Sequence, residues 1–247
     1  MSQNRRHRLS RIVIATALIA GCGHSATPST NAVSPPASTA SADGNVAPSN
    51  AASFAAGVGA PRDSISALAD RGRILGDSTA TVWVVMASDF QCPFCKTWHD
   101  AAFRQLMATY VKTGRVRLAF LNMPLSMHPN AVPAAEAAMC ASVQNKFWEM
   151  HEALFATQAA WETMPDPRPK FDAIATAHGV DMAPWRECVA EHLTRSLIQA
   201  DHDRATATGV NSTPTFFVDG YKLSGADADL APAIDAALAK NGKKPAS

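Results

Sequence analysis

Residues 81–103, TVWVVMASDFQCPFCKTWHDAAF, contain the clearest structural signal in the chain. The apolar, β-branched run at 82–86 predicts a buried strand, and a short loop follows at 87–91. The segment CPFC, residues 92–95, then opens a stretch in which apolar residues recur at helical spacing. Two cysteines are therefore expected at the start of a helix that leaves the carboxyl end of a strand.

The start of such a helix favours an anion, because its first backbone N–H groups lack partners and the helix dipole is positive there. A thiolate is such an anion, so we expect Cys92 to be nucleophilic, with a pKa below the ~8.5 of a free thiol. Pro93 falls in the first turn, where a helix accepts proline best. Cys92 and Cys95 are thus predicted to form a redox dithiol.

The chain has 247 residues, of which 47% are hydrophobic, enough for one good core and a subdomain. Its net charge of +1 includes four arginines between residues 5 and 11, a segment without acidic residues. The remainder therefore carries a charge of about −3. No basic stripe with interleaved aromatic residues appears, so nucleic acid is not an expected partner.

Residues 1–22 are predicted to form a signal peptide, in which a basic stretch precedes an apolar run at 12–20 that is too short to span a bilayer. The run ends in Ile19-Ala20-Gly21-Cys22, which resembles the lipobox of bacterial lipoproteins. That resemblance implies cleavage before Cys22 and lipidation of its thiol. An ordinary secretory signal is the alternative, but the small residues before Cys22 and the polar sequence after it favour the lipoprotein.

Residues 23–60 are rich in Ala, Ser, Thr and Pro and almost lack large apolar side chains. Such a segment cannot bury enough surface to offset its ordering entropy, so we expect a disordered tether. The folded domain is predicted to occupy residues 61–247.

Within that domain the pattern of elements predicts an α/β fold. The expected elements are a helix at 64–71, a short strand and turn at 73–77, a strand at 82–86, a helix from Cys92 to Thr113-Gly114, a strand at 115–121, helices at 134–143, 147–158, 171–178 and 184–207, a hairpin at 215–223 and a helix at 227–240. Their order is β-α-β, a helical insertion at about 131–208, and β-β-α. In the helix at 184–207 a buried apolar stripe is expected, made of Trp185, Cys188, Val189, Leu193, Leu197 and Ala200.

This order, with a CxxC after the main strand, resembles the thioredoxin superfamily, and the insertion is similar to its DsbA-like branch. The stretches that carry the resemblance are DFQCPFC (89–95), FWEMH with LF (147–155) and GVNSTPTFF (209–217), and it covers about residues 74–240. A lone CxxC is a weak motif. Its combination with a distant Thr-Pro just before a hairpin is strong.

The resemblance implies a role for each matching position. Cys92 would be the exposed attacking cysteine and Cys95 its buried partner, with Pro93 and Phe94 completing the active-site loop. Pro214 would be a cis-proline facing the dithiol, and Thr213 would present backbone groups to an extended substrate. A trans proline that starts a strand is the alternative for Pro214.

Besides Cys22, four cysteines allow three pairings. If the CxxC cysteines pair with each other, Cys140 is left with Cys188, and some DsbA-like proteins carry a second disulfide in the insertion. This bond would stabilise the subdomain by about 2–4 kcal/mol in an oxidising compartment. Two separate buried thiols are the alternative.

No cofactor is expected other than the redox-active disulfide Cys92–Cys95, and no metal. A zinc site would need a second close pair of ligands, which the sequence lacks. A copper-handling protein remains an alternative, because Cys92, Cys95 and a histidine could bind Cu(I). His99 follows Cys95 by one helical turn, but its ring is expected to point outward. The other histidines, predicted to be surface or satisfied core residues, are His128, His151, His178, His192 and His202.

The favoured function is that of a monomeric envelope oxidase, which forms disulfides in cysteine-containing exported proteins and is reset by a membrane redox partner. Its link to the membrane would be the lipid anchor. Because Phe94 offers the thiolate neither a hydrogen bond nor a charge, we expect a potential between the roughly −120 and −270 mV extremes of the superfamily. A reductase or isomerase on the same fold is the first alternative, and a non-catalytic binding lipoprotein is another.

Overall fold

The computed structural model describes residues 65–242. The predicted signal peptide at 1–22, with Cys22, and the predicted tether at 23–60 lie outside the described residues. So do the two ends of the predicted domain, 61–64 and 243–247. The boundaries drawn there remain predictions.

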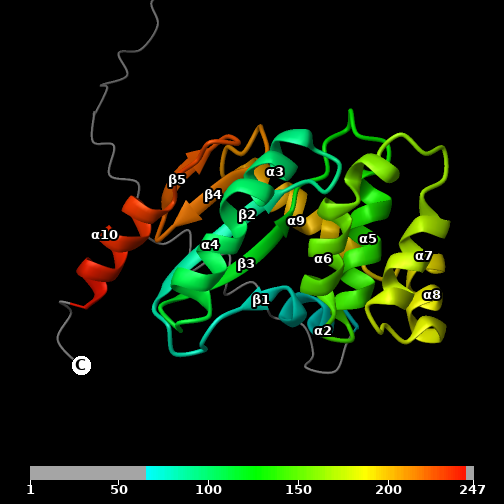
Figure 1. Cartoon of the computed structure of the whole chain (residues 1–247), viewed down its shortest axis with the longest axis horizontal. Coiled ribbons are helices and arrows are strands. Elements are labelled where there is room, and N and C mark those ends of the chain that lie inside the picture. The colour runs from blue at the N-terminus through cyan, green and yellow to red at the C-terminus, as the bar shows by residue number, and fades with distance from the viewer. Residues whose placement is uncertain (1–64, 243–247) are drawn as a thin grey trace, which may run out of the picture. The chain divides into compact units, whose positions relative to one another are not determined.

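A five-stranded mixed sheet forms the centre of the fold, in the order β1-β3-β2-β4-β5 (Figure 1). The strands are β1 (Ile74–Leu75), β2 (Val82–Ser88), β3 (Val116–Asn122), β4 (Thr215–Val218) and β5 (Tyr221–Ser224). β2 and β3 run parallel, while every other neighbouring pair is antiparallel. β2 is buried along nearly its whole length, as its continuous apolar sequence predicts for a central strand. The predicted α/β fold is confirmed.

The helix after β2 carries the two cysteines and runs from Pro93 to Val111. It consists of α3 (Pro93–Trp98), the π-helical turn η1 (His99–Phe103), α4 (Arg104–Leu106) and a second π-helical turn, η2 (Met107–Val111). Gly114, with a φ of 73°, ends the run where the sequence predicts. Trp98 holds the run on the sheet, because its ring lies 4.4 Å from that of Phe216 in β4.

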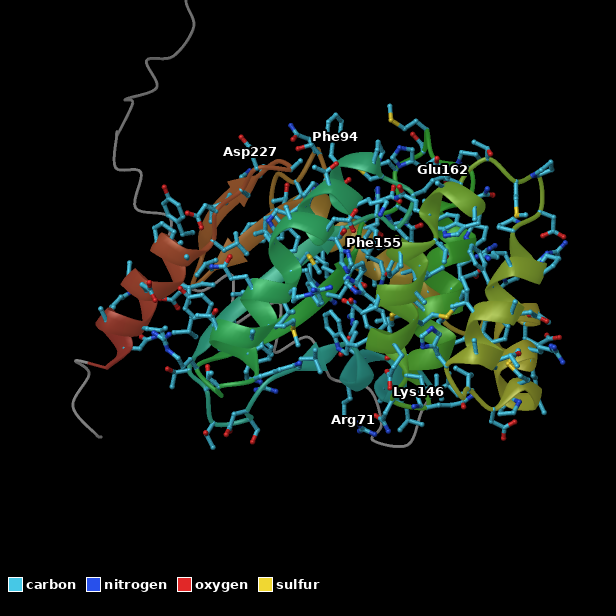
Figure 2. The ribbon with its side chains drawn as sticks, viewed as in Figure 1. Arg71, Phe94, Lys146, Phe155, Glu162 and Asp227 are labelled. Atoms are coloured by element: carbon cyan, nitrogen blue, oxygen red, sulfur yellow. A yellow bond between two sulfur atoms is a disulfide. The ribbon has the colours of Figure 1, made fainter. Side chains whose placement is uncertain are left out.

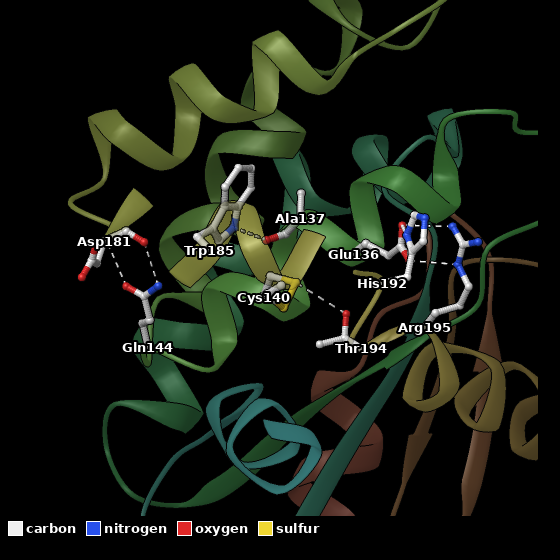
Figure 3. Close-up of a disulfide and its surroundings, with 10 residues drawn as sticks. Glu136, Ala137, Cys140, Gln144, Asp181, Trp185, His192, Thr194 and Arg195 are labelled. Carbon is white, nitrogen blue, oxygen red and sulfur yellow. Dashed lines mark hydrogen bonds and ion pairs between the residues drawn. A yellow bond between two sulfur atoms is a disulfide. The ribbon is translucent and has the colours of Figure 1, made fainter. Parts of the chain in front are cut away.

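The predicted helical insertion is present, and in Figure 1 most of its helices gather at the right of the view while α10 (Ala231–Asn241) lies at the left. Its elements are α5 (Ala131–Ser142), α6 (Phe147–Ala156), the 3-10 turn η3 (Gln158–Ala160), α7 (Arg168–Ala177), α8 (Met182–Ala190) and α9 (Arg195–Ala207). A disulfide between Cys140 and Cys188 joins α5 to α8 (Figure 3). Trp185 of α8 also donates to the carbonyl oxygen of Ala137 at 3.0 Å. The remaining helix, α2 (Ile65–Gly72), precedes β1.

The single helix predicted over 184–207 is wrong, because the chain turns between α8 and α9. His192 has a φ of 53°, and His192 and Arg195 both contact the carboxylate of Glu136 on α5 at 2.9 Å (Figure 3). The turn redirects the predicted stripe: Trp185 and Cys188 are buried, but Leu193 is 37% exposed. Ala200 is exposed as well, and α9 buries Ile198, Asp201 and Ala205 instead.

A buried charged cluster fixes α9 against the carboxyl end of β3. Arg73 forms ion pairs with Asp70 and Asp201 and donates to the carbonyl oxygen of Phe120 at 3.0 Å. Asp201 also accepts from the backbone and side-chain nitrogens of Asn122 at 3.1 and 2.8 Å. Burial opposes the charge on Arg73, but the two carboxylates raise its pKa above the ordinary value.

Among residues 65–242, no helix combines the length and the apolar character that crossing a bilayer requires.

Candidate active site

Cys92 and Cys95 lie where the loop after β2 leads into α3. Cys92 is the residue before the helix, with φ −69° and ψ 122°, and Pro93 takes the first helical position. The carbonyl oxygen of Cys92 accepts from the backbone nitrogen of Lys96 at 3.2 Å, which starts the helix. The predicted position of both cysteines at a helix start is therefore present in the structure.

Thr213 and Pro214 lie beside this pair although more than a hundred residues separate them in sequence. The Thr213–Pro214 peptide bond is cis, and Pro214 directly precedes β4. Because β4 pairs with β2, with Thr215 opposite Ala87, the bond is brought to the end of β2 where Cys92 follows. The Cys92 thiol donates to the carbonyl oxygen of Thr213 at 3.6 Å.

The expectation that Cys92 is exposed is wrong for this structure. Cys92 is 2% exposed and Cys95 1%, and the carbonyl oxygen of Thr213 contacts the Cys92 sulfur. Phe94 is the exposed member of the segment, at 64%, and projects from the edge of the molecule (Figure 2). The loop thus presents an apolar ring to solvent directly beside a covered thiol.

The two thiols have opposite acidities. The hydrogen bond from Cys95 is the main reason that the pKa of Cys92 falls to about 6. Burial opposes this shift, while the backbone N–H groups of Cys95 and Phe94 add to it. Burial and the neighbouring Cys92 raise the pKa of Cys95 well above that of a free thiol. Cys92 is therefore the thiolate of the pair at neutral pH.

A buried carboxylate shapes the loop before Cys92, and nothing in the sequence reasoning singled it out. Asp89 accepts from the backbone nitrogens of Gln91 at 2.7 Å and Leu125 at 2.9 Å, and it contacts Nδ1 of His128 at 2.6 Å. His128 is therefore the partner of a buried carboxylate. The Asp-x-Gln spacing of a local side-chain turn was the available signal.

Amides from the insertion hold the same loop from the other side. Gln158 donates to the carbonyl oxygens of Phe90 at 2.7 Å and Cys92 at 3.2 Å. Gln91 accepts from the backbone nitrogen of Asn130 at 2.6 Å, and its amide nitrogen donates to the Glu162 carbonyl at 2.7 Å. The loop that leads into α3 is therefore held by contacts with the insertion. The hydrophobic periodicity of the sequence does not indicate such long-range contacts.

The set of Cys92, Cys95 and a histidine that would bind Cu(I) is not assembled among the described residues. His99 does not point outward as expected. Its side chain is 11% exposed, and its Nε2 lies 3.1 Å from Glu152 Oε1 on α6.

Known proteins resemble this chain over the same region. The family model described as Thioredoxin matches residues 69–236. The Na(+)/H(+) antiporter NhaA 3 of Salinispora tropica is 37% identical over 157 residues, which cover 63% of this chain and 23% of that protein. The chain spans only 23–24% of the length of three such antiporters.

Two further relatives match over most of their own length. The probable disulfide bond formation protein D of Bacillus anthracis is 28% identical over 179 residues, covering 67% of this chain and 78% of that protein. The crystal structure of oxidised BdbD from Bacillus subtilis superposes with a TM-score of 0.62 and 25% identity. That match covers 68% of this chain and 94% of BdbD.

Proposed function

This chain belongs to the thioredoxin family, and from that premise we propose that it is a protein thiol:disulfide oxidoreductase acting through Cys92 and Cys95. One observation carries the proposal: a thiol with a pKa of about 6 lies at a helix start, beside a second cysteine and the Thr213–Pro214 backbone. A reactive, low-pKa thiol next to a resolving thiol is what exchange chemistry needs. The relative from Bacillus anthracis, a probable disulfide bond formation protein, supports the proposal.

In the oxidising direction, a substrate thiolate attacks Cys92 Sγ of the Cys92–Cys95 disulfide. The substrate–Cys92 bond forms, the disulfide breaks, and Cys95 leaves and takes up a proton, as its raised pKa favours. A second substrate thiolate then attacks the substrate sulfur of this mixed disulfide. Cys92 leaves as a thiolate, so the substrate loses two electrons and the pair gains them.

The acidity of Cys92 favours the oxidase over the reductase. A low pKa makes Cys92 a good leaving group and stabilises the reduced form of the pair at neutral pH. A stabilised reduced form means a more oxidising disulfide. The Phe94 side chain adds no charge or hydrogen bond, so the potential is expected between the roughly −120 and −270 mV extremes of the superfamily.

Substrates would be exported proteins that bind as an extended strand on the Thr213 backbone. Such a strand displaces the Cys92–Thr213 contact and brings its own sulfur beside Sγ, with Phe94 offering apolar contact. Backbone pairing reads shape rather than sequence, which suits a broad set of substrates.

The proposed location is the cell envelope, with a monomer held by a lipid on Cys22 and reset by a membrane redox partner. Residues 1–60 supply the support: a basic and apolar leader, a lipobox-like segment and a polar linker. In a bacterial host, labelled fatty acid should be incorporated into the protein and not into its Cys22→Ser variant. Equal labelling of both forms would contradict the anchor.

A trapping experiment tests the exchange itself. Cys95→Ser removes the resolving thiol, so envelope proteins should accumulate as mixed disulfides on Cys92 that reducing agent releases. The Cys92→Ser/Cys95→Ser form is the matched control and should trap none. Equal recovery from both variants would refute the assignment. The equilibrium of the wild-type pair with glutathione then gives the potential, and a value near −270 mV would favour the reductase.

A further inference from the structure

Three metal-ligating side chains meet outside the redox pair, between its helix and the insertion. His99 begins η1, and His151 and Glu152 are neighbours on α6. Each offers one ligand atom, and the three atoms lie within 4.8 Å of one another. Within residues 65–242 this is the sole group of three such side chains found this close together.

Both ring nitrogens of His99 face carboxylate oxygens. Its Nδ1 lies 3.2 Å from Asp100 Oδ1, and its Nε2 lies 3.1 Å from Glu152 Oε1. A carboxylate only accepts, so both ring nitrogens would need a hydrogen to make both contacts. A cation between Nε2 and Glu152 serves equally well, with Asp100 then holding the Nδ1 hydrogen. A carboxylate in that position is the usual support of a metal-bound histidine.

His151 distinguishes the two possibilities. It is fully buried, and neither of its ring nitrogens has a hydrogen-bond partner. Its Nδ1 lies 3.7 Å from the same Glu152 oxygen, too far for a hydrogen bond. A hydrogen on His99 leaves this imidazole unpartnered, which is unfavourable for a buried polar group. A metal ion would bind it.

The surroundings hold the His151 ring in place without supplying a polar partner. Aromatic rings enclose it with centroids 4.9–6.1 Å away: Phe90, Phe103, Phe120, Phe147, Trp148 and Phe155. Figure 2 shows Phe155 in the interior, and its ring also stacks on His99 at 4.9 Å. Packing therefore fixes the His99 and His151 rings, whose centroids lie 5.3 Å apart. Metal ligands need to be preorganised in this way.

We propose that His99 Nε2, His151 Nδ1 and Glu152 Oε1 form a Zn²⁺ site, with water as the fourth ligand. Two histidines and a carboxylate are a zinc ligand set, and tetrahedral zinc places its ligand atoms about 3.4 Å apart. The separations of 3.1 and 3.7 Å to Glu152 bracket that value, and all three ligand atoms lie within 4.8 Å of one another. The carboxylate is half exposed and lines an open hollow with His99, so the ion has a way in.

Such a site would connect the two halves of the fold. His99 lies one helical turn beyond Cys95, whereas His151 and Glu152 belong to the insertion. Zinc would pin the redox helix to α6 and raise the melting temperature. The site does not depend on the proposed exchange chemistry, and it would overturn the expectation that the chain holds no metal.

The test is a zinc titration of the purified protein with Cys92 and Cys95 kept as a disulfide, so that thiolates cannot bind. Calorimetry with zinc chloride should give one equivalent, and the melting temperature should rise with zinc. His99→Gln and Glu152→Gln should each weaken binding at least tenfold while the zinc-free melting temperature stays near that of the parent. Asp100→Asn, which removes the support of His99, should weaken binding about 10–100-fold.

His192→Gln is the matched control, since His192 also contacts a glutamate but with no second histidine on it. It should leave zinc affinity unchanged. Three results would each overturn the proposal: no binding to the oxidised protein, binding that survives both His99→Gln and Glu152→Gln, or binding that appears only when the cysteines are reduced.

Discussion

Cys92 and Cys95 are equally buried, yet one is acidic and the other is not. Hydrogen bonds from the Cys95 thiol and from backbone N–H groups lower the pKa of Cys92. Burial and the neighbouring Cys92 raise the pKa of Cys95. The sequence alone predicts a lowered pKa for Cys92 from its place at a helix start. It does not predict the Thr213 contact that covers the sulfur, because that contact depends on the pairing of β4 with β2.

The first prediction concerns the ionisation of Cys92 in the reduced protein. Its alkylation rate by iodoacetamide should rise with pH about a midpoint near 6. Cys95→Ser replaces the thiol that donates to Cys92 with a shorter hydroxyl group. The pH midpoint of Cys92 alkylation should therefore move in this variant. Thiolate absorbance at 240 nm measures this midpoint in the wild-type protein and in the Cys95→Ser variant. A wild-type midpoint near the ~8.5 of a free thiol would contradict the site as described.

The same ionisation predicts how stability depends on pH. Because the pKa of Cys92 is lower in the folded state, the thiolate stabilises the reduced protein fully above the unfolded pKa. This contribution is lost as the pH falls through about 6. The oxidised protein lacks it, so the difference in unfolding free energy between the two forms should change across that window. If the unfolding free energies of the reduced and oxidised protein changed in parallel with pH, the lowered pKa of Cys92 would be contradicted.

Elements with strong periodicity are where sequence and structure agree best. β2 and β3 follow their apolar patterns, and the Asp219-Gly220 turn takes the positive φ angles of 48° and 87° that a tight hairpin requires. The break between α8 and α9 escaped prediction because Glu136, far away in sequence, draws His192 and Arg195 into a turn. Local pattern cannot contain such a tertiary contact.

The Arg73–Asp201 cluster gives a prediction for how α9 is held. Asp201→Ala leaves the Arg73 guanidinium buried without its main partner and frees two donors of Asn122. Removing one member of a buried pair costs about 3–5 kcal/mol, to be measured by urea unfolding. Asp203→Ala, exposed on the same helix, is the control and should change stability by no more than about 0.5 kcal/mol. A small effect of Asp201→Ala would contradict the role of the cluster.

In the molecule as a whole, the order of elements and the two distant motifs sufficed to predict the fold. What they could not supply is how the insertion supports the redox loop. The side-chain amides of Gln158, Gln91 and Asn130 donate to backbone carbonyl oxygens that are distant in sequence. Such groups are recognised only when the elements that carry them are placed in space.

The Cys140–Cys188 disulfide should stabilise the insertion without taking part in exchange. Replacing both residues by alanine should lower the free energy of unfolding by about 2–4 kcal/mol, since the bond closes a long loop. The pH midpoint of Cys92 should stay where it is, because neither residue contributes to it. Denaturant unfolding and the alkylation profile measure the two effects. A shifted Cys92 midpoint would contradict this division of roles.

The most direct test of the proposed activity is stoichiometric oxidation of a reduced two-cysteine peptide by the oxidised protein. Mass spectrometry should show one peptide disulfide formed for each Cys92–Cys95 disulfide lost, at a rate that Cys92→Ser abolishes and the Cys140→Ala/Cys188→Ala form retains. A peptide that stays reduced, or one oxidised equally well by the Cys92→Ser form, would contradict the central claim.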